Sequence, residues 1–182
     1  MNDKKVNIGI IGLGNIGANL YKYIQKNKKK IYQLTGCHLN IKYVSAKNIK
    51  KKRIVKINKK IWLKNPFNII KKNVDIIIEL IGGSDGISKK IVEQALKNNK
   101  HVITANKALI AKHGDYLSKI AEKNRVNLEF EASVAGGIPI IRALKEGLAT
   151  NKFKKVTGIL NGTCNYILSE MENSNNTFKN VL

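Results

Sequence analysis

Three glycines near the start of the chain have a spacing that suits phosphate binding. The apolar run Val6 to Ile11 leads directly into Gly12-Leu13-Gly14-Asn15-Ile16-Gly17, and apolar residues then recur at helical spacing. In a strand, turn and helix of this kind, the first glycine permits the turn, the second lets a pyrophosphate approach the backbone, and the third lets the helix lie close to the strand. Phosphates then meet free N–H groups at the helix N-terminus. The sequence therefore predicts a dinucleotide site that uses Gly12, Leu13, Gly14, Asn15, Ile16 and Gly17.

Lys107 is the side chain that we select as the candidate for chemistry. It follows a short apolar strand, His101 to Thr104, at the edge of the fold where the dinucleotide is expected. An ammonium group beside a nicotinamide ring could polarise a carbonyl group or move a proton. We expect Lys107 to be partly buried, and the alternative is that it is one of the many surface lysines. Glu79 ends another apolar run and is either a satisfied core carboxylate or a support for the site; the sequence leaves both open.

The second expected strand, Cys37 to Val44, indicates which cofactor is bound. In this class of fold an Asp or Glu at the end of that strand accepts hydrogen bonds from the ribose of NAD. Here the whole stretch from Lys4 to Val74 has no carboxylate and nineteen basic residues. A 2′-phosphate would suit such surroundings, and Lys47, Lys51 and Arg53 follow the strand within reach. NADP is therefore the expected cofactor, with NAD possible if these lysines only reflect a general enrichment.

Strands and helices alternate along the first part of the chain, which predicts an α/β fold with a Rossmann-type doubly wound parallel sheet. Ligands of such sheets bind beyond the carboxyl ends of the strands. We expect a helix after the glycine turn, with the apolar residues Ile16, Leu20, Tyr23 and Ile24 at helical spacing, and then a linker at about Lys30 to Gly36. The expected strands are Val6 to Ile11, Cys37 to Val44, Val74 to Ile81, His101 to Thr104 and Val126 to Phe130. Beyond the ends of two of them lie the further cofactor-binding candidates Gly82, Gly83, Ser84, Thr104, Asn106 and Lys107.

From Glu131 onward the sequence becomes small, apolar and rich in glycine. We expect a helix from Ile140 to Leu148, a strand from Phe153 to Leu160, and a helix from Thr163 to Met171 with Thr163 as its cap. A loop is expected at Asn173 to Asn176. The domains predicted are therefore a dinucleotide-binding domain over 1–130 and the beginning of a second α+β domain over 131–182. The chain ends one turn into a new helix, so we expect it to be cut short.

The net charge of +22 suggests a nucleic-acid partner only at first sight. Of the 34 basic residues only Arg53, Arg125 and Arg142 are arginine, whereas specific nucleic-acid readers favour the bidentate guanidinium. We therefore attribute the lysines to a general drift in residue usage and expect neither a nucleic-acid nor a membrane partner. The two cysteines have no metal-binding spacing and suit a reduced, cytoplasmic protein. His38, His101 and His113 have no partner at a recognisable spacing, so we interpret them as structural or surface residues.

Five longer motifs make the chain resemble homoserine dehydrogenase. They are GLGNIG at Gly12 to Gly17, ELIGG at Glu79 to Gly83, KHVITANKALIA at Lys100 to Ala111, FEASVAGGIPII at Phe130 to Ile141 and LNGTCNYIL at Leu160 to Leu168. The motifs span nearly the whole chain, and TANKAL and EASVAGGIP are far more specific than the glycine motif.

The resemblance implies hydride transfer from NAD(P)H to L-aspartate 4-semialdehyde, which gives L-homoserine for threonine and methionine biosynthesis. It implies that Lys107 serves in proton transfer, that Lys47, Lys51 and Arg53 are the family's basic residues after the second strand, and that the full-length protein is a homodimer. It also implies a monovalent cation, usually sodium, and places it on Glu131, Val134, Gly136 and Ile138.

The family pattern continues beyond the residues present here. In the family, the later region supplies the carboxylates that grip the homoserine amine, a second catalytic lysine and the rest of the dimerising sheet. The resemblance therefore implies cofactor binding, and an alternative to the active enzyme is a catalytically inactive NADP-binding fragment of it.

Overall fold

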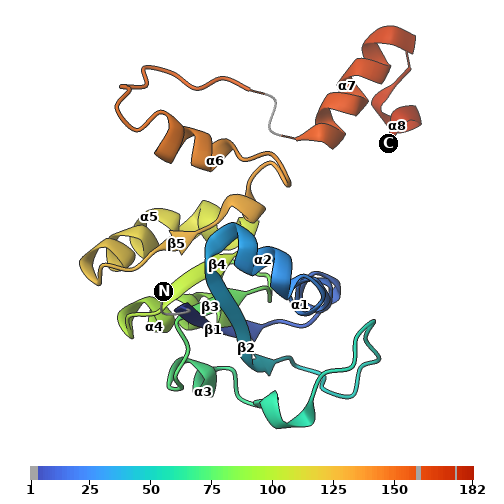
Figure 1. The fold of residues 1–182 in the computed structure, drawn as a ribbon. Helices are drawn as coiled ribbons and strands as arrows, with labels where there is room; N and C mark the ends of the chain where they lie inside the picture. Colours follow the sequence, from blue (N-terminus) through green and yellow to red (C-terminus); the bar gives the residue numbers. More distant parts are fainter. Residues whose placement is uncertain (1–3, 159–160, 175) are drawn as a thin grey trace. The chain divides into compact units, whose positions relative to one another are not determined.

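The computed structural model describes residues 4–158, 161–174 and 176–182. The chain forms two compact units, Met1–Val134 and Ala135–Leu182. The first unit is built on one five-stranded sheet in the order β2-β1-β3-β4-β5, and every neighbouring pair is parallel (Figure 1). The strands are β1 (Lys4–Ile11), β2 (Cys37–Ser45), β3 (Ile76–Glu79), β4 (His101–Thr104) and β5 (Leu128–Glu129). The predicted α/β fold with a parallel sheet is confirmed.

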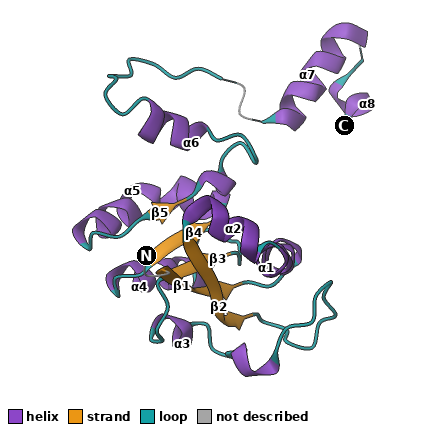
Figure 2. Ribbon diagram, viewed as in Figure 1, coloured by secondary structure: helices purple, strands orange, loops and turns teal. Residues whose placement is uncertain are grey.

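Helices cover both faces of this sheet (Figure 2). On one face, α4 (Ile87–Lys97) and α5 (Lys107–Lys123) bury their apolar sides against Ile77 and Val102. On the other face, α1 (Asn15–Lys26) packs against Ile8 and Ile10 of β1. Strands that are apolar on both sides are needed for this arrangement, because each face of the sheet must bury its side chains under a helix. The near-continuous isoleucine runs of β1 and β3 meet that requirement.

The apolar side of α1 is rotated from the predicted one. Gly17 and Ile24 are buried, whereas Ile16 and Tyr23 are exposed. The reason is Gly17, since a Cβ there would lie 2.1 Å from the carbonyl oxygen of Gly12. The helix must turn its glycine toward the strand, and this contact decides which residues follow it into the core.

Two connections also differ from the prediction. The expected linker is a helix, α2 (Lys28–Thr35), which ends where Gly36 takes a left-handed conformation with φ of 66°. Strand β3 is shorter than the run Val74 to Ile81, because its last residues leave the sheet for a turn. The remaining short helices of the first unit are η1 (Lys59–Ile61), α3 (Phe67–Ile70) and η2 (Glu131–Ser133).

The second unit contains helices α6 (Ile140–Arg142), η3 (Ala143–Gly147, a π-helical turn), α7 (Gly162–Ser174) and α8 (Phe178–Val181). The strand predicted at Phe153 to Leu160 is wrong for residues 153–158, which form no regular structure, and residues 159–160 lie outside the described part. A strand needs a neighbour for its backbone groups, and the described part of this unit has no strand to pair with it.

The start of α7 also differs from the prediction. Its cap is Asn161, whose Oδ1 accepts a hydrogen bond from the backbone N–H of Cys164 at 3.0 Å, and not Thr163. The helix continues to Ser174, into the residues expected to form a loop. In the part of the chain that the structure describes, no helix has the length and apolarity needed to cross a bilayer.

Candidate functional site

The glycine turn after β1 depends on glycine at its first and third glycine positions. Gly12 has φ of 104°, and a Cβ on it would lie 2.5 Å from the backbone of Leu80. Its N–H donates to the carbonyl oxygen of Ser45 at 2.9 Å, which ties the turn to the end of β2. Gly14 differs, because a Cβ on it would meet no atom within 4 Å. The open space predicted for a ligand therefore lies at Gly14, while Gly12 and Gly17 are needed for close packing.

The N-terminus of α1 begins at this open space. Gly14 is its N-cap residue, and no side chain caps the helix. The first intrahelical bond runs from the N–H of Ala18 to the carbonyl of Gly14, so the N–H groups of Asn15, Ile16 and Gly17 have no acceptor within the helix. Unpaired N–H groups and the positive end of the helix dipole suit an anion such as a pyrophosphate.

The turn after β3 lies beside the glycine turn, since the N–H of Leu80 donates to the carbonyl of Ile11 at 2.8 Å. Gly82 and Gly83 both have positive φ, of 88° and 82°. Ser84 donates its hydroxyl proton to the carboxylate of Asp85 at 2.7 Å. These three predicted cofactor residues therefore sit at the carboxyl edge of the sheet, as expected from their positions in the sequence.

Asp85 fastens this turn to α5. Its two oxygens contact Nζ of Lys112 at 2.8 Å and Nε2 of His113 at 2.9 Å. The hydrogen bond from Lys112, followed by those from His113 and Ser84, holds the pKa of the Asp85 carboxyl well below its usual range. His113 thus has a carboxylate partner that the sequence did not reveal, because the partner is 28 positions away, and its contact with Asp85 fits the structural role predicted for it.

The residues after β4 are tied to the same turn. Asn106 caps α5, where its Oδ1 accepts from the N–H of Leu109 at 3.1 Å, and its amide group donates to the carbonyl of Gly83 at 2.6 Å. Thr104 is fully buried and donates its hydroxyl proton to Glu79 at 2.6 Å. Lys107 is the first residue of α5. Its side chain is exposed, so the partial burial predicted for it is not present in this chain.

The loop after β2 contains the three basic residues predicted to meet a 2′-phosphate. Lys47 and Lys51 are exposed, whereas Arg53 is half-buried. Four of the five N–H donors of Arg53 bind backbone carbonyls: those of Leu13 at 3.0 Å, Ile49 at 3.0 Å, Lys51 at 2.8 Å and Asn48 at 2.6 Å. Arg53 thus joins this loop to the glycine turn and leaves one donor for a ligand.

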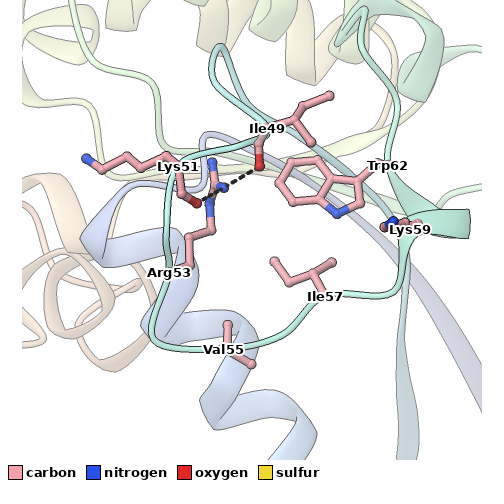
Figure 3. Close-up of a pocket in the computed structure, with 7 residues that line it drawn as sticks. All are labelled: Ile49, Lys51, Arg53, Val55, Ile57, Lys59 and Trp62. Carbon is pink, nitrogen blue, oxygen red and sulfur yellow. Dashed lines mark hydrogen bonds between the residues drawn. The ribbon is translucent and has the colours of Figure 1, made fainter.

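A pocket of about 330 Å³ opens within this loop. Figure 3 shows Ile49, Ile57 and Trp62 gathered around it, while the Lys51 side chain points away from the indole. The Arg53 guanidinium lies 5.0 Å from the centre of the Trp62 ring, a cation–π contact. Trp62 was not among the predicted site residues, and its only signal was that it is the one tryptophan of the chain.

The four predicted cation ligands fall in different units. Glu131 and Val134 belong to the first unit, and Gly136 and Ile138 to the second. One carboxylate with main-chain carbonyls is an oxygen donor set that fits a hard cation. Ala135 and Gly136 have φ of 50° and 63°, a sharp turn between the expected ligands. Among the described residues, no group of three His, Cys, Asp or Glu side chains is placed to hold a metal ion.

Two family models match most of the chain. The model described as the NAD-binding domain of homoserine dehydrogenase matches residues 12–131, and the model described as homoserine dehydrogenase matches residues 139–182. Homoserine dehydrogenases from Neisseria gonorrhoeae and Bacillus subtilis are 43% and 41% identical to the chain, and each alignment covers 98% of it. A crystal structure of a homoserine dehydrogenase from Thiobacillus denitrificans superposes with a TM-score of 0.84 and 37% identity over 98% of the chain.

Each of these relatives is much longer than the chain. The chain spans only 41% of the length of these two relatives and of that crystal structure. Within this span, the NAD-binding model takes in the glycine turn, the Gly82–Gly83 turn and the start of α5. The chain belongs to the homoserine dehydrogenase family.

Proposed function

We propose that this protein binds NADP(H) at the carboxyl edge of the sheet and serves the homoserine dehydrogenase reaction, the NAD(P)H-dependent interconversion of L-aspartate 4-semialdehyde and L-homoserine. The observation that carries the proposal is the geometry of the glycine turn. A Cβ on Gly14 would meet no atom within 4 Å, and Gly14 is the N-cap residue of α1, where no side chain caps the helix. A pyrophosphate at this point would accept hydrogen bonds from the free N–H groups. The reaction belongs to threonine and methionine biosynthesis, and we propose a cytoplasmic location.

The choice of NADP over NAD is supported by the loop after β2. No carboxylate stands between Lys4 and Val74 to bind a ribose hydroxyl, whereas Lys47 and Lys51 have exposed ammonium groups. Arg53 would contribute its charge and its one remaining donor, and above all would hold the loop in place. We therefore assign the 2′-phosphate to Lys47, Lys51 and Arg53, with the two lysines as the principal ligands.

This assignment is tested with the double variant Lys47→Glu and Lys51→Glu. We expect its affinity for NADPH to fall by about a hundredfold, because two charged contacts to phosphate are lost and two repulsive charges are added, while NADH affinity changes by less than about threefold. The matched control is Lys29→Glu with Lys30→Glu on α2, the helix that leads into the start of β2 and not into the loop at its end, and it changes the net charge equally. Equal weakening of NADPH and NADH binding in the test variant would contradict the assignment.

Lys107 is the proposed catalytic residue. A bound nicotinamide ring supplies the hydride or accepts it, and Lys107 stands at the start of α5 where it could hold a proton for the substrate oxygen. Its exposed side chain is free to reach a substrate carbonyl. The Gly82–Gly83 turn would lie against the nicotinamide, because the strand order places β3 on the side of β1 away from the adenosine loop. Thr104 is fully buried and bonded to Glu79, so it would act through Glu79 without touching the ring.

We also propose a monovalent cation with Glu131, Val134, Gly136 and Ile138 as its ligands. The donor set supports this assignment, since sodium prefers carboxylate and carbonyl oxygens. A homodimer is proposed for the full-length protein on the ground of the family alone.

The experiment that tests the function is homoserine-dependent reduction of NADP by this 182-residue chain, with NADPH binding followed in the same sample. Turnover would support the enzyme as proposed. Binding without turnover would support the alternative, a cofactor-binding part of the enzyme without catalytic activity. A chain that binds neither NADPH nor NADH would refute the proposal.

A further inference from the structure

Glu79 is a fully buried carboxylate at the end of β3, directly after the buried isoleucines 77 and 78. A carboxylate costs free energy to bury unless hydrogen bonds replace its water. Here Oε1 accepts from the N–H of Ile81 at 2.6 Å and of Gly82 at 3.4 Å, and Oε2 accepts from the hydroxyl of Thr104 at 2.6 Å. Within the described part of the chain, these donors are neutral and no lysine or arginine pairs with Glu79. The carboxylate therefore accepts hydrogen bonds from two backbone N–H groups and one hydroxyl, in place of an ion pair.

The hydrogen bonds continue from Thr104 to the other side of the same turn. The Thr104 hydroxyl oxygen accepts from the N–H of Asn106 at 3.0 Å. The Asn106 amide then donates to the carbonyl of Gly83 at 2.6 Å and to the hydroxyl oxygen of Ser88 at 2.9 Å. The turn is thus held at Gly82 by Glu79 and at Gly83 by Asn106, and Asn106 also caps the helix that begins at Lys107.

We propose that Glu79 is a positioning residue, which fixes the Gly82–Gly83 turn and the start of α5 relative to each other. The inference rests on the proposed function, because that turn and Lys107 are the groups proposed to surround the nicotinamide. An apolar residue at position 79 would fill the core of β3, yet it would leave the N–H groups of Ile81 and Gly82 and the Thr104 hydroxyl without their acceptor. A single carboxylate with two oxygens can serve both the turn and the neighbouring strand, which is why an acid stands at this buried place.

If Glu79 positions the Gly82–Gly83 turn, a change at Glu79 should weaken the binding of the nicotinamide half of the cofactor and leave the binding of the adenosine half unchanged. The turn and Lys107 lie on the β3 and β4 side of the sheet, whereas Arg53 and its loop lie on the β2 side. Glu79→Gln keeps the size of the side chain but places an amide N–H₂ where Oε1 or Oε2 must accept. We expect the affinity for NADPH to fall about tenfold, as for one misaligned hydrogen bond to a charged group, and the affinity for 2′,5′-ADP, which lacks the nicotinamide, to change less than about twofold.

A second pair of variants tests the same chain of hydrogen bonds should Glu79→Gln fail to fold. Thr104→Ser keeps the hydroxyl and is expected to retain NADPH affinity, whereas Thr104→Val removes it and is expected to match Glu79→Gln. The combined variant should lose no more than either single variant, since both break one connected network. The control is Glu93→Gln on α4, which loses its ion pair to Lys97 but keeps an oxygen that can accept from the Tyr116 hydroxyl, and it is expected to bind both ligands like the parent chain.

The outcomes are distinguishable. The positioning role would be overturned if Glu79→Gln and Thr104→Val left the ratio of NADPH affinity to 2′,5′-ADP affinity unchanged, whether both affinities fell equally or neither fell. A parent chain that binds neither ligand would refute the proposed function, and the positioning role is then decided by amide NMR of the free protein. We expect Thr104→Val to shift the backbone amide signals of Gly83 and Lys107, and unshifted signals would overturn the proposal.

Discussion

A single methyl group at Gly17 should destabilise the first unit, whereas the same group at Gly14 should affect only cofactor binding. In Gly17→Ala the new Cβ would lie 2.1 Å from the carbonyl oxygen and 3.1 Å from the carbonyl carbon of Gly12. These atoms belong to the backbone of a tight turn, so no side chain can move aside. Helix α1 must instead shift away from β1 and lose part of its packing.

The size of the effect follows from two opposing contributions. Forcing a methyl group into a filled site costs about 1–3 kcal/mol, and a backbone obstacle favours the upper end of that range. Alanine is preferred over glycine within a helix by about 1 kcal/mol, which offsets part of this cost. The free energy of unfolding should therefore fall by about 1–2 kcal/mol, a large share of the roughly 5–15 kcal/mol of a typical domain.

Gly14→Ala provides the matched control, because its Cβ would meet no atom within 4 Å. Alanine is less favourable than glycine at an N-cap, which lowers stability, but it also lowers the entropy of the unfolded chain, which raises stability. Because these effects are of similar size, the free energy of unfolding should change by no more than about 0.5 kcal/mol. The methyl group would, however, stand where the pyrophosphate is proposed to approach. We expect the NADPH affinity of Gly14→Ala to fall at least about tenfold.

Both variants can be measured by urea unfolding followed through the fluorescence of Trp62, the one tryptophan of the chain. With a denaturant slope of about 2 kcal/mol per molar urea, Gly17→Ala should lower the midpoint by about 0.5–1 M. An unchanged midpoint for Gly17→Ala would refute the close approach of α1 to the turn. An equal loss in Gly14→Ala would refute the open space assigned to the ligand.

Three further predictions concern side chains around the same edge of the sheet. Because hydrogen bonds lower the pKa of Asp85, its contribution to stability is present above the ordinary value of 3.8 and is lost as the pH falls through the lower folded-state pKa. In Asp85→Asn the Tm should therefore fall less steeply between about pH 4 and pH 2 than in the parent chain. The control is Asp115→Asn, which removes an exposed ion pair. Identical slopes of Tm against pH in the parent chain and Asp85→Asn would contradict the linkage. Arg53→Lys keeps the charge but cannot bind four carbonyls, so trypsin should cut the loop after β2 several-fold faster, and an unchanged cutting rate would show that the guanidinium does not hold the loop. Lys107→Ala, made in a full-length family member with the same motif, should abolish turnover and leave NADPH affinity within about threefold. Retained turnover, or a loss of NADPH binding large enough to account for the lost turnover, would exclude the catalytic role.

The basic residues after β2 show how far residue type alone can be interpreted. The absence of a carboxylate and the presence of Lys47, Lys51 and Arg53 were visible in the sequence and led to the NADP prediction. The sequence did not reveal that Arg53 donates most of its N–H groups to backbone carbonyls, or that its guanidinium makes a cation–π contact with Trp62. Such contacts depend on the path of an irregular loop, which has no periodic pattern in the sequence.

Local patterns were sufficient wherever an element depends on its own residues. The apolar runs of β1 and β3 were sufficient to predict the parallel sheet, because a strand buried on both faces needs such a run, and the glycine turn between β1 and α1 led to the proposed dinucleotide site. The predicted strand at 153–158 was wrong for the complementary reason. Its apolar residues resemble those of a strand, but pairing depends on a neighbour that the described part of the second unit does not contain.

The sequence by itself thus determined the fold class, the family resemblance and the candidate residues at the ends of β1, β3 and β4. Only the tertiary structure decided the rotation of α1, the partner of His113 and the role of Glu79. The last two of these rest on atoms that are distant in the sequence: His113 and Asp85 are 28 positions apart, and Glu79 and Thr104 are 25 positions apart and 2.6 Å apart in space. Hydrogen bonding acts over ångströms, so a buried carboxylate reveals its purpose only when the neighbouring strand has been placed beside it.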